Sequence, residues 1–206
     1  MARPIHAALA AALVLAPLAA AQPREPAPAP PAEGAGEIRG RKARRAAIAR
    51  MLGVLRALDR QAIEAAGLAF DKAEAPEVRE VARAILEDHR RLDRAIDRLA
   101  EEGLAPEAPD DPTWWALQRA HEQQLQDWRQ LEGAAFDAAF VASQPFRHRF
   151  GLALIEDGRR HARDLERVLQ VLDRAHRSMG DHLEMSLGLL QRRFGAAQEG
   201  PPGQGG

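Results

Sequence analysis

Hydrophobic and polar residues follow a helical rhythm along most of the chain. Between residues 41 and 194, apolar side chains recur at steps of three and four, which places them on one face of an α-helix. This spacing predicts long helices over residues 41–71, 76–102, 134–157 and 162–194, and a shorter helix over residues 112–132. The sequence shows no strand-like alternation, so we predict an all-α fold.

Proline and glycine residues mark the expected helix ends. Pro76 and Pro112 suit first-turn positions, and Gly103, Gly133 and Gly158 supply stops. Because the turn between the first two helices is short, these helices should be antiparallel neighbours. The short helix falls in the long connection between the second and third long helices. The expected architecture is therefore an up-down four-helix bundle with a short extra connector helix.

The two ends of the chain differ from this helical body. Residues 1–21 have a positive start, a short apolar run and three alanines, which is typical of a signal peptide. Residues 22–40 form a Pro/Ala-rich linker expected to be disordered, and residues 195–206 are expected to be a disordered tail. We therefore expect a folded domain over residues 41–194 that is periplasmic or secreted after cleavage, with no transmembrane helix in the mature form.

Composition excludes several classes of protein. The 206 residues include no cysteine, so disulfides, thiolate metal sites and cysteine nucleophiles are excluded. The formal net charge is −1, which gives no reason to expect a nucleic-acid partner. No phosphate-binding loop, nucleophile elbow or paired-acid motif is present, so the sequence favours a non-enzymatic protein.

Three histidines interrupt or border the apolar faces of three different helices. His89 lies in the stripe of the second long helix, and His148 lies in that of the third. His182 lies at the edge of the last helix's stripe, which runs through His176 and Met179. A buried imidazole needs a hydrogen-bond partner or a metal ion, so these histidines are the candidate functional residues.

The third long helix has further features that affect its histidine. Asp137 lies eleven positions before His148 and faces the same side. Pro145 should kink the helix and free the carbonyl of Val141. Phe146 and Phe150 lie on a second apolar side, and a helix that is apolar nearly all round is expected inside the bundle.

Three carboxylates are candidates to accompany the histidines. Asp137 shares the face of His148, and Asp59 falls inside the apolar stripe of the first helix. Glu64 lies on the opposite side of that helix by the same geometry. For Asp59, an ion pair with an arginine at the rim is an equally open interpretation.

Two interpretations of the histidines remain open. In the first, the imidazoles form a buried polar layer, hydrogen-bonded to Asp137, Gln144 and Ser186, which fixes the register of the helices. In the second, His89, His148 and His182 converge on one divalent metal, namely zinc, copper or iron, with a carboxylate as the fourth ligand. No Glu-x-x-His precedes any of them, so a di-iron site is not expected.

Three stretches resemble one bacterial family. PEVREVARAILEDH, GAAFDAAFVASQPFRH and DHLEMSLGLL look like the signature segments of the domain of unknown function 4142 family, with its histidines falling on His89, His148 and His182. The resemblance implies an exported, ferritin-like bundle, often labelled an outer-membrane protein. Ala62 stands where the family usually has a glutamate in its first helix. Asp59 or Glu64 would have to take over the role of that glutamate as a candidate ligand.

These observations give three functional hypotheses. The first is an exported, non-enzymatic helical protein with a binding role in the cell envelope or in stress. The second is a metal-binding or redox protein that uses the inward histidines. The third is an interaction module whose partner is a second copy of the chain or an envelope protein.

Overall fold

Five α-helices make up the computed structural model over residues 33–194, the part of the chain that the structure describes. They are α1 (Glu33–Lys72), α2 (Pro76–Glu101), α3 (Pro112–Gln130), α4 (Gly133–His161) and α5 (Glu166–Phe194). The all-α fold and the five predicted helices are confirmed. The expected signal peptide, most of the expected linker and the expected tail lie outside the described residues.

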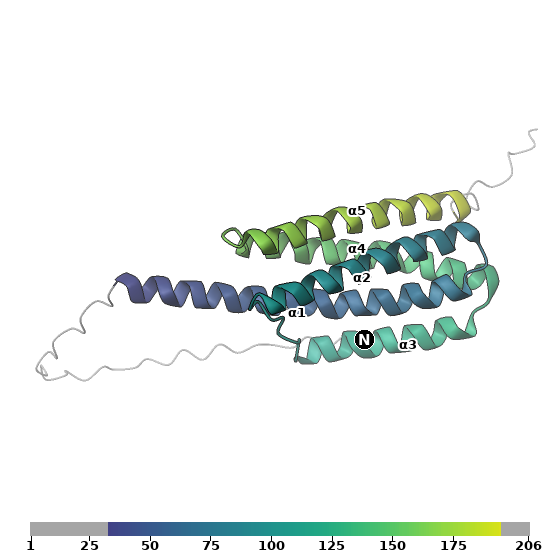
Figure 1. Ribbon diagram of the computed structural model, residues 1–206. Helices are drawn as coiled ribbons and strands as arrows, with labels where there is room; N and C mark the ends of the chain where they lie inside the picture. Colours follow the sequence, from purple (N-terminus) through teal and green to yellow (C-terminus); the bar gives the residue numbers. More distant parts are fainter. Residues whose placement is uncertain (1–32, 195–206) are drawn as a thin grey trace, which may run out of the picture.

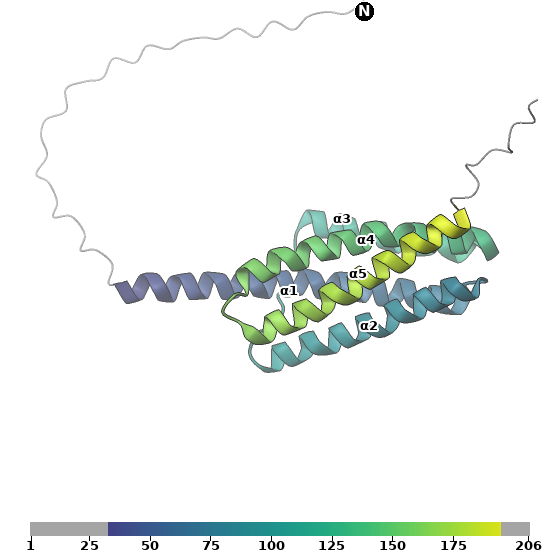
Figure 2. The ribbon, with the colours of Figure 1, turned by 90° about the horizontal axis from the view of Figure 1, so that it is seen from above.

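Four of the helices lie side by side and the fifth covers one flank. Consecutive helices run antiparallel, and α1, α2, α4 and α5 surround a common interior (Figure 1). The shorter α3 lies along the outside, next to α1 and α4 (Figure 2). Gln61 of α1 donates a hydrogen bond of 2.8 Å to Gln118 of α3, which ties the two helices together.

The buried positions follow a regular seven-residue repeat. In α2, α4 and α5, steps of four and three alternate without interruption among the buried residues, as in coiled coils, and in α1 the same repeat passes through the half-buried Ala62. Val168, Leu172, Ala175, Met179, His182, Ser186 and Leu189 form this seam in α5. The corresponding seams of the other helices pass through Asp59 in α1, His89 in α2 and His148 in α4. Each long helix therefore places an ionisable residue of its seam near its middle, and α4 and α5 add the buried Gln144 and Ser186 at neighbouring seam positions.

This polar level separates two apolar cores. One core lies toward the α1–α2 turn and includes Phe136, Phe140 and Trp128. The other lies toward the opposite end and includes Leu52, Ile96 and Leu172. Burial of these two clusters is the main driving force for folding, and it fixes the register at which the polar residues meet.

The structure corrects three of the expectations about helix boundaries and faces. The first helix begins at Glu33 rather than at residue 41, so the last part of the expected linker is helical. No proline follows Pro31 until Pro76, and the early turns of α1 project beyond the other helices (Figure 1). The side chains of residues 36–45 are exposed, so no apolar stripe marks this extension in the sequence.

The other two corrections concern helix faces. His176 was placed inside the α5 stripe but is only half-buried, whereas His182 is 1% exposed. Phe146 and Phe150 were expected inside the bundle, but both are exposed on the outer side of α4. In both helices, a strict seven-residue repeat identifies the buried face better than the general three-and-four pattern.

No stretch of α1 to α5 combines the length and the hydrophobicity that a bilayer crossing requires.

Gly53 allows the loop after α2 to pack directly on α1. A Cβ atom added at Gly53 would lie 1.6 Å from the carbonyl oxygen of Glu107, whose backbone N–H donates a 2.8 Å hydrogen bond to the carbonyl of Ala49. Gly53→Ala should therefore destabilise the protein by several kcal/mol or displace this loop, although alanine is the better helix former by about 1 kcal/mol.

Gly67 provides the matched control in the same helix. No atom lies within 4 Å of a Cβ added there, so Gly67→Ala should raise the free energy of unfolding by about 0.5–1 kcal/mol. Urea unfolding of both variants checks the prediction. Equal stabilisation by the two substitutions would show that the loop does not rest on Gly53.

Candidate metal centre

Three imidazole rings from three helices meet at the polar level of the interior. His89 of α2, His148 of α4 and His182 of α5 are all buried, with exposures of 5%, 3% and 1%. Their ring centroids are 5.2 to 6.0 Å apart. One nitrogen from each ring lies within 4.8 Å of one nitrogen of the other two. We call these three residues the histidine cluster.

Each ring is held by a hydrogen bond through one of its nitrogens. Nδ1 of His89 lies 2.6 Å from Oδ1 of Asp59, and Nε2 of His182 lies 2.9 Å from Oδ2 of Asp88. Nδ1 of His148 lies 2.9 Å from the backbone carbonyl of Gln144. All three partner atoms are oxygens that accept, so these ring nitrogens carry the protons.

The second nitrogen of each ring has no hydrogen-bond partner among the described residues. Nε2 of His89, Nε2 of His148 and Nδ1 of His182 are buried without a hydrogen bond to any described residue. In each ring this is the nitrogen that keeps its lone pair, because the other nitrogen is the donor. Three buried lone pairs in one small volume call for an explanation, and a bound cation supplies one.

The electrostatics keep two of the rings, those of His148 and His182, neutral. Burial lowers the pKa of His148 to about 3, assisted by the nearby rings of His89 and His182. Burial also lowers the pKa of His182 to about 4, against the opposing effect of Asp88. Neutral imidazoles are the form that binds metal ions.

Asp59 supports the cluster from α1. Its side chain is fully buried, and burial raises the pKa of its carboxyl against the opposing hydrogen bond from His89. One oxygen holds His89, and the other has no partner among the described residues. Within residues 33–194 no carboxylate joins the mutually close group of nitrogens, so Asp59 acts here by orienting a ring.

The structure places the other two predicted carboxylates elsewhere. Asp137 is buried at the α1–α2 turn, where its side chain accepts hydrogen bonds from the backbone N–H groups of Glu74 (3.1 Å) and Ala75 (2.8 Å). Glu64 is exposed on α1 and lies 3.4 Å from Nε2 of His121 on α3. Neither residue is brought to the histidine cluster.

Sequence reasoning missed Asp88 as a contributor to the site, and it identified Gln144 as a partner without the group that makes the contact. Asp88, which orients His182, is only partly buried and lies off the α2 stripe, so periodicity gives no sign of it. The carbonyl that His148 uses belongs to Gln144 rather than to Val141, the one that Pro145 was expected to free. The expected hydrogen bonds from the histidine rings to Asp137 and Ser186 are also absent within residues 33–194, since Ser186 donates to the backbone of His182.

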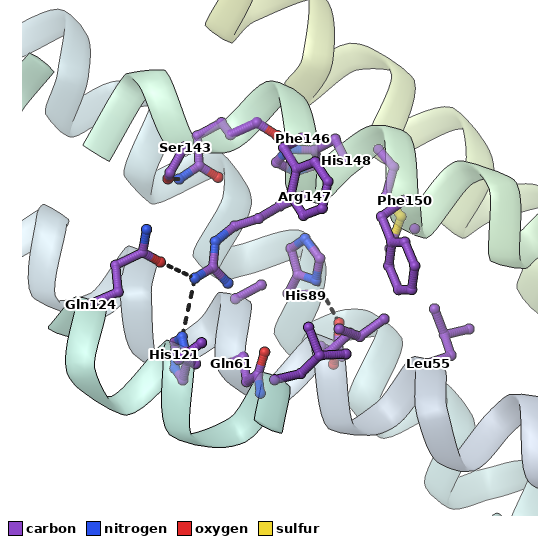
Figure 3. Close-up of a pocket in the computed structure, with 18 residues that line it drawn as sticks. Leu55, Gln61, His89, His121, Gln124, Ser143, Phe146, Arg147, His148 and Phe150 are labelled. Atoms are coloured by element: carbon purple, nitrogen blue, oxygen red, sulfur yellow. Dashed lines mark hydrogen bonds and ion pairs between the residues drawn. The ribbon is translucent and has the colours of Figure 1, made fainter. Parts of the chain in front are cut away.

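A cavity of about 380 Å³ opens beside the cluster (Figure 3). It lies between α1, α3 and α4 and reaches His89 and His148 at its inner end. Most of its wall is apolar, including Leu55 and Met179. A small ligand could therefore approach two of the three histidines, His89 and His148, from outside the bundle.

Comparison with protein families gives one match. The family described as Domain of unknown function (DUF4142) matches residues 40–189, a range that contains all three histidines. Neither the curated proteins nor the solved structures yield a match to the chain.

Replacing Asp137 tests whether this residue stabilises the α1–α2 turn without contributing to metal binding at the histidine cluster. Asp137→Asn leaves one backbone N–H without an acceptor, so it should lower the free energy of unfolding by about 1–3 kcal/mol. Metal binding should stay unchanged, because Asp137 lies at the α1–α2 turn. Urea unfolding and metal titration of the variant check both points, and loss of metal affinity in a folded Asp137→Asn protein would contradict the assignment.

The depressed histidine pKa values make stability depend on pH. Unfolded histidine titrates near 6.5, whereas His148 and His182 titrate near 3 and 4 in the folded protein. The unfolded chain therefore binds more protons between these values, and stability should fall from pH 7 to pH 4 by about 1.4 kcal/mol per pH unit for each such histidine. The raised pKa of Asp59 acts in the opposite direction and makes the slope shallower.

Urea unfolding at several pH values, with a chelator present, measures this dependence. The half-buried His176 provides the control, and His176→Ala should keep the wild-type slope. If the free energy of unfolding at pH 5 equals or exceeds that at pH 7, then His148 and His182 are not buried in neutral form.

Proposed function

The chain belongs to the DUF4142 family, whose function is not known, and we propose from the geometry of its site that it is a metal-binding protein. The proposed ligands are Nε2 of His89, Nε2 of His148 and Nδ1 of His182. The single observation that carries this proposal is the convergence of three buried imidazoles, with one nitrogen of each within 4.8 Å of the others, in rings that each keep one nitrogen without a partner among the described residues. Asp59, Asp88 and the carbonyl of Gln144 act as the outer partners that orient the rings.

The dimensions fit a first-row transition metal. In a tetrahedral site with metal–nitrogen bonds of about 2.0–2.1 Å, the nitrogens lie roughly 3.3 Å apart. Nitrogens of the histidine cluster lie within 4.8 Å of one another, so a bound ion would draw the rings closer together. Three imidazoles without a thiolate suit zinc, copper or iron, and the absence of cysteine excludes thiolate ligands.

The coordination pattern favours an open site over a closed structural one. Structural zinc sites have four protein ligands, whereas sites with three protein ligands keep a position for water or a substrate. Here the protein supplies three histidine ligands, and two of these residues, His89 and His148, line the cavity. The site therefore suits ligand binding or redox chemistry at an accessible ion better than a purely structural role that links the helices.

We also propose that α1, α2, α4 and α5 form a ferritin-like bundle around this ion. Support comes from the position of the cluster, since ferritin-like proteins place their metals between facing helices at mid-bundle. This chain differs in using histidines from three helices in place of the Glu-x-x-His pairs. The signal-like residues 1–21 support an envelope or secreted location.

Metal titration of histidine variants tests the proposal. Protein purified without affinity histidines should bind about one zinc or copper ion per chain, measured by elemental analysis and calorimetry. His89→Ala and His182→Ala should remove this binding. Asp59→Asn should weaken it by about 10- to 100-fold, because an outer partner of a ligand ring is lost. His176→Ala, on the same helix as His182, should bind like the wild type.

His148→Leu distinguishes a metal site from a polar layer that serves stability. The substitution places an apolar side chain at a seam position and leaves no further buried group unpaired, because the Gln144 carbonyl that His148 contacts remains a helical acceptor. Metal binding should disappear while the metal-free protein loses no more than about 1 kcal/mol of stability. Strong destabilisation with no metal bound by the wild type would instead support the polar layer.

A further inference from the structure

Arg147 introduces a positive charge into the wall of the cavity. Its side chain extends from α4 toward α3, where Nη2 donates to Nδ1 of His121 at 3.1 Å and to Oε1 of Gln124 (Figure 3). Arg147 is half-buried, and this burial lowers the pKa of its guanidinium. Both partners are side chains that supply a lone pair but no negative charge at neutral pH.

No carboxylate within residues 33–194 forms an ion pair with Arg147. Glu64 lies beyond His121, where it contacts Nε2 of that ring at 3.4 Å and Arg129 at 3.9 Å. The pKa of His121 is itself lowered by burial and by Arg147, so the ring stays neutral beside the guanidinium. A cation withdrawn from water without a counter-ion is costly, and an anion in the cavity would offset that cost.

The mouth of the same cavity exposes apolar side chains. Phe146 is 74% exposed, and its ring stacks on Phe150 with a centroid distance of 6.4 Å. Leu117 of α3 is 41% exposed and also lines the cavity. Large exposed apolar side chains beside a cavity are typical of a binding surface. A ligand with an aromatic or aliphatic body would cover them.

We propose that the cavity binds a small organic anion, with its carboxylate or sulfonate on Arg147 and its apolar body against Leu117, Phe146 and Phe150. The volume of about 380 Å³ falls within the range of small-molecule pockets, and the wall combines an apolar surface with a few polar groups. This inference goes beyond the proposed metal site and does not depend on it, because none of the groups that hold the anion is a metal ligand.

A pair of fluorescent probes that differ only in charge tests the proposal. The probes are 8-anilinonaphthalene-1-sulfonate and its uncharged analogue N-phenyl-1-naphthylamine, titrated into the full chain with a chelator present. The sulfonate should bind at one saturable site and bind more tightly than the neutral probe. Arg147→Gln should weaken sulfonate binding by about tenfold or more, and change binding of the neutral probe less than twofold.

Arg149 is the matched control, because it lies on the exposed side of the same helix, two residues beyond Arg147. Arg149→Gln should leave both probes unaffected, whereas Phe146→Ala should weaken both. Equal losses in the Arg147 and Arg149 variants would overturn the proposal, since they would reflect the net charge of the surface. Absence of saturable sulfonate binding would also overturn it.

Ala120 offers a second test if Arg147→Gln does not fold. This residue lines the cavity from α3 and is exposed, so a larger side chain can be introduced there without repacking the core. Ala120→Phe should abolish binding of both probes, and retained binding would show that they bind elsewhere. Because the chelator removes metal throughout, failure of these tests leaves the metal proposal intact, and failure of the metal titrations leaves this one intact.

Discussion

Three imidazoles withdrawn from water at one level of the interior are the constraint on which the rest of the structure depends. One nitrogen of each ring donates a hydrogen bond to an orienting oxygen, and the other is buried without a partner among the described residues. Buried polar groups without partners cost free energy, so the two apolar cores on either side must supply the stability that holds them in place. The same cores fix the helix register, and thereby the convergence of the rings.

The seven-residue repeat explains why this arrangement is compatible with a regular fold. Every polar residue of the level occupies a seam position that would otherwise carry leucine or alanine, so the helices pack without a bulge. Gly151 on α4 adds to this fit, because a Cβ there would lie 2.7 Å from the sulfur of Met179, directly beside the cluster. The interior is therefore shaped around the histidines by small residues as well as by large ones.

Much of the fold and part of the site could be predicted from the sequence. Periodicity gave the five helices and the inward positions of His89 and His148, because burial and helical spacing are linked directly. Asp59 was also placed inward by its step from Leu55. His182 was assigned only to an edge, since the general three-and-four pattern drifts along a helix of this length while the true repeat does not.

The remainder depends on contacts between segments far apart in the chain. Asp137 accepts hydrogen bonds from the turn at Glu74 and Ala75, and Asp88 of α2 contacts His182 of α5. The cavity exists because α3 lies over α1 and α4, which also leaves Phe146 at its rim rather than in a core. Helical periodicity describes one helix at a time, so it carries no information about these contacts.

X-ray absorption spectroscopy of the zinc- or copper-loaded protein tests the central claim most directly. We expect a first shell that contains three imidazole nitrogens at about 2.0–2.1 Å together with one oxygen ligand such as water, and we expect this shell to disappear in the His148→Leu protein. A shell made of oxygen atoms alone, or a spectrum unchanged by His148→Leu, would contradict a metal centre built on His89, His148 and His182.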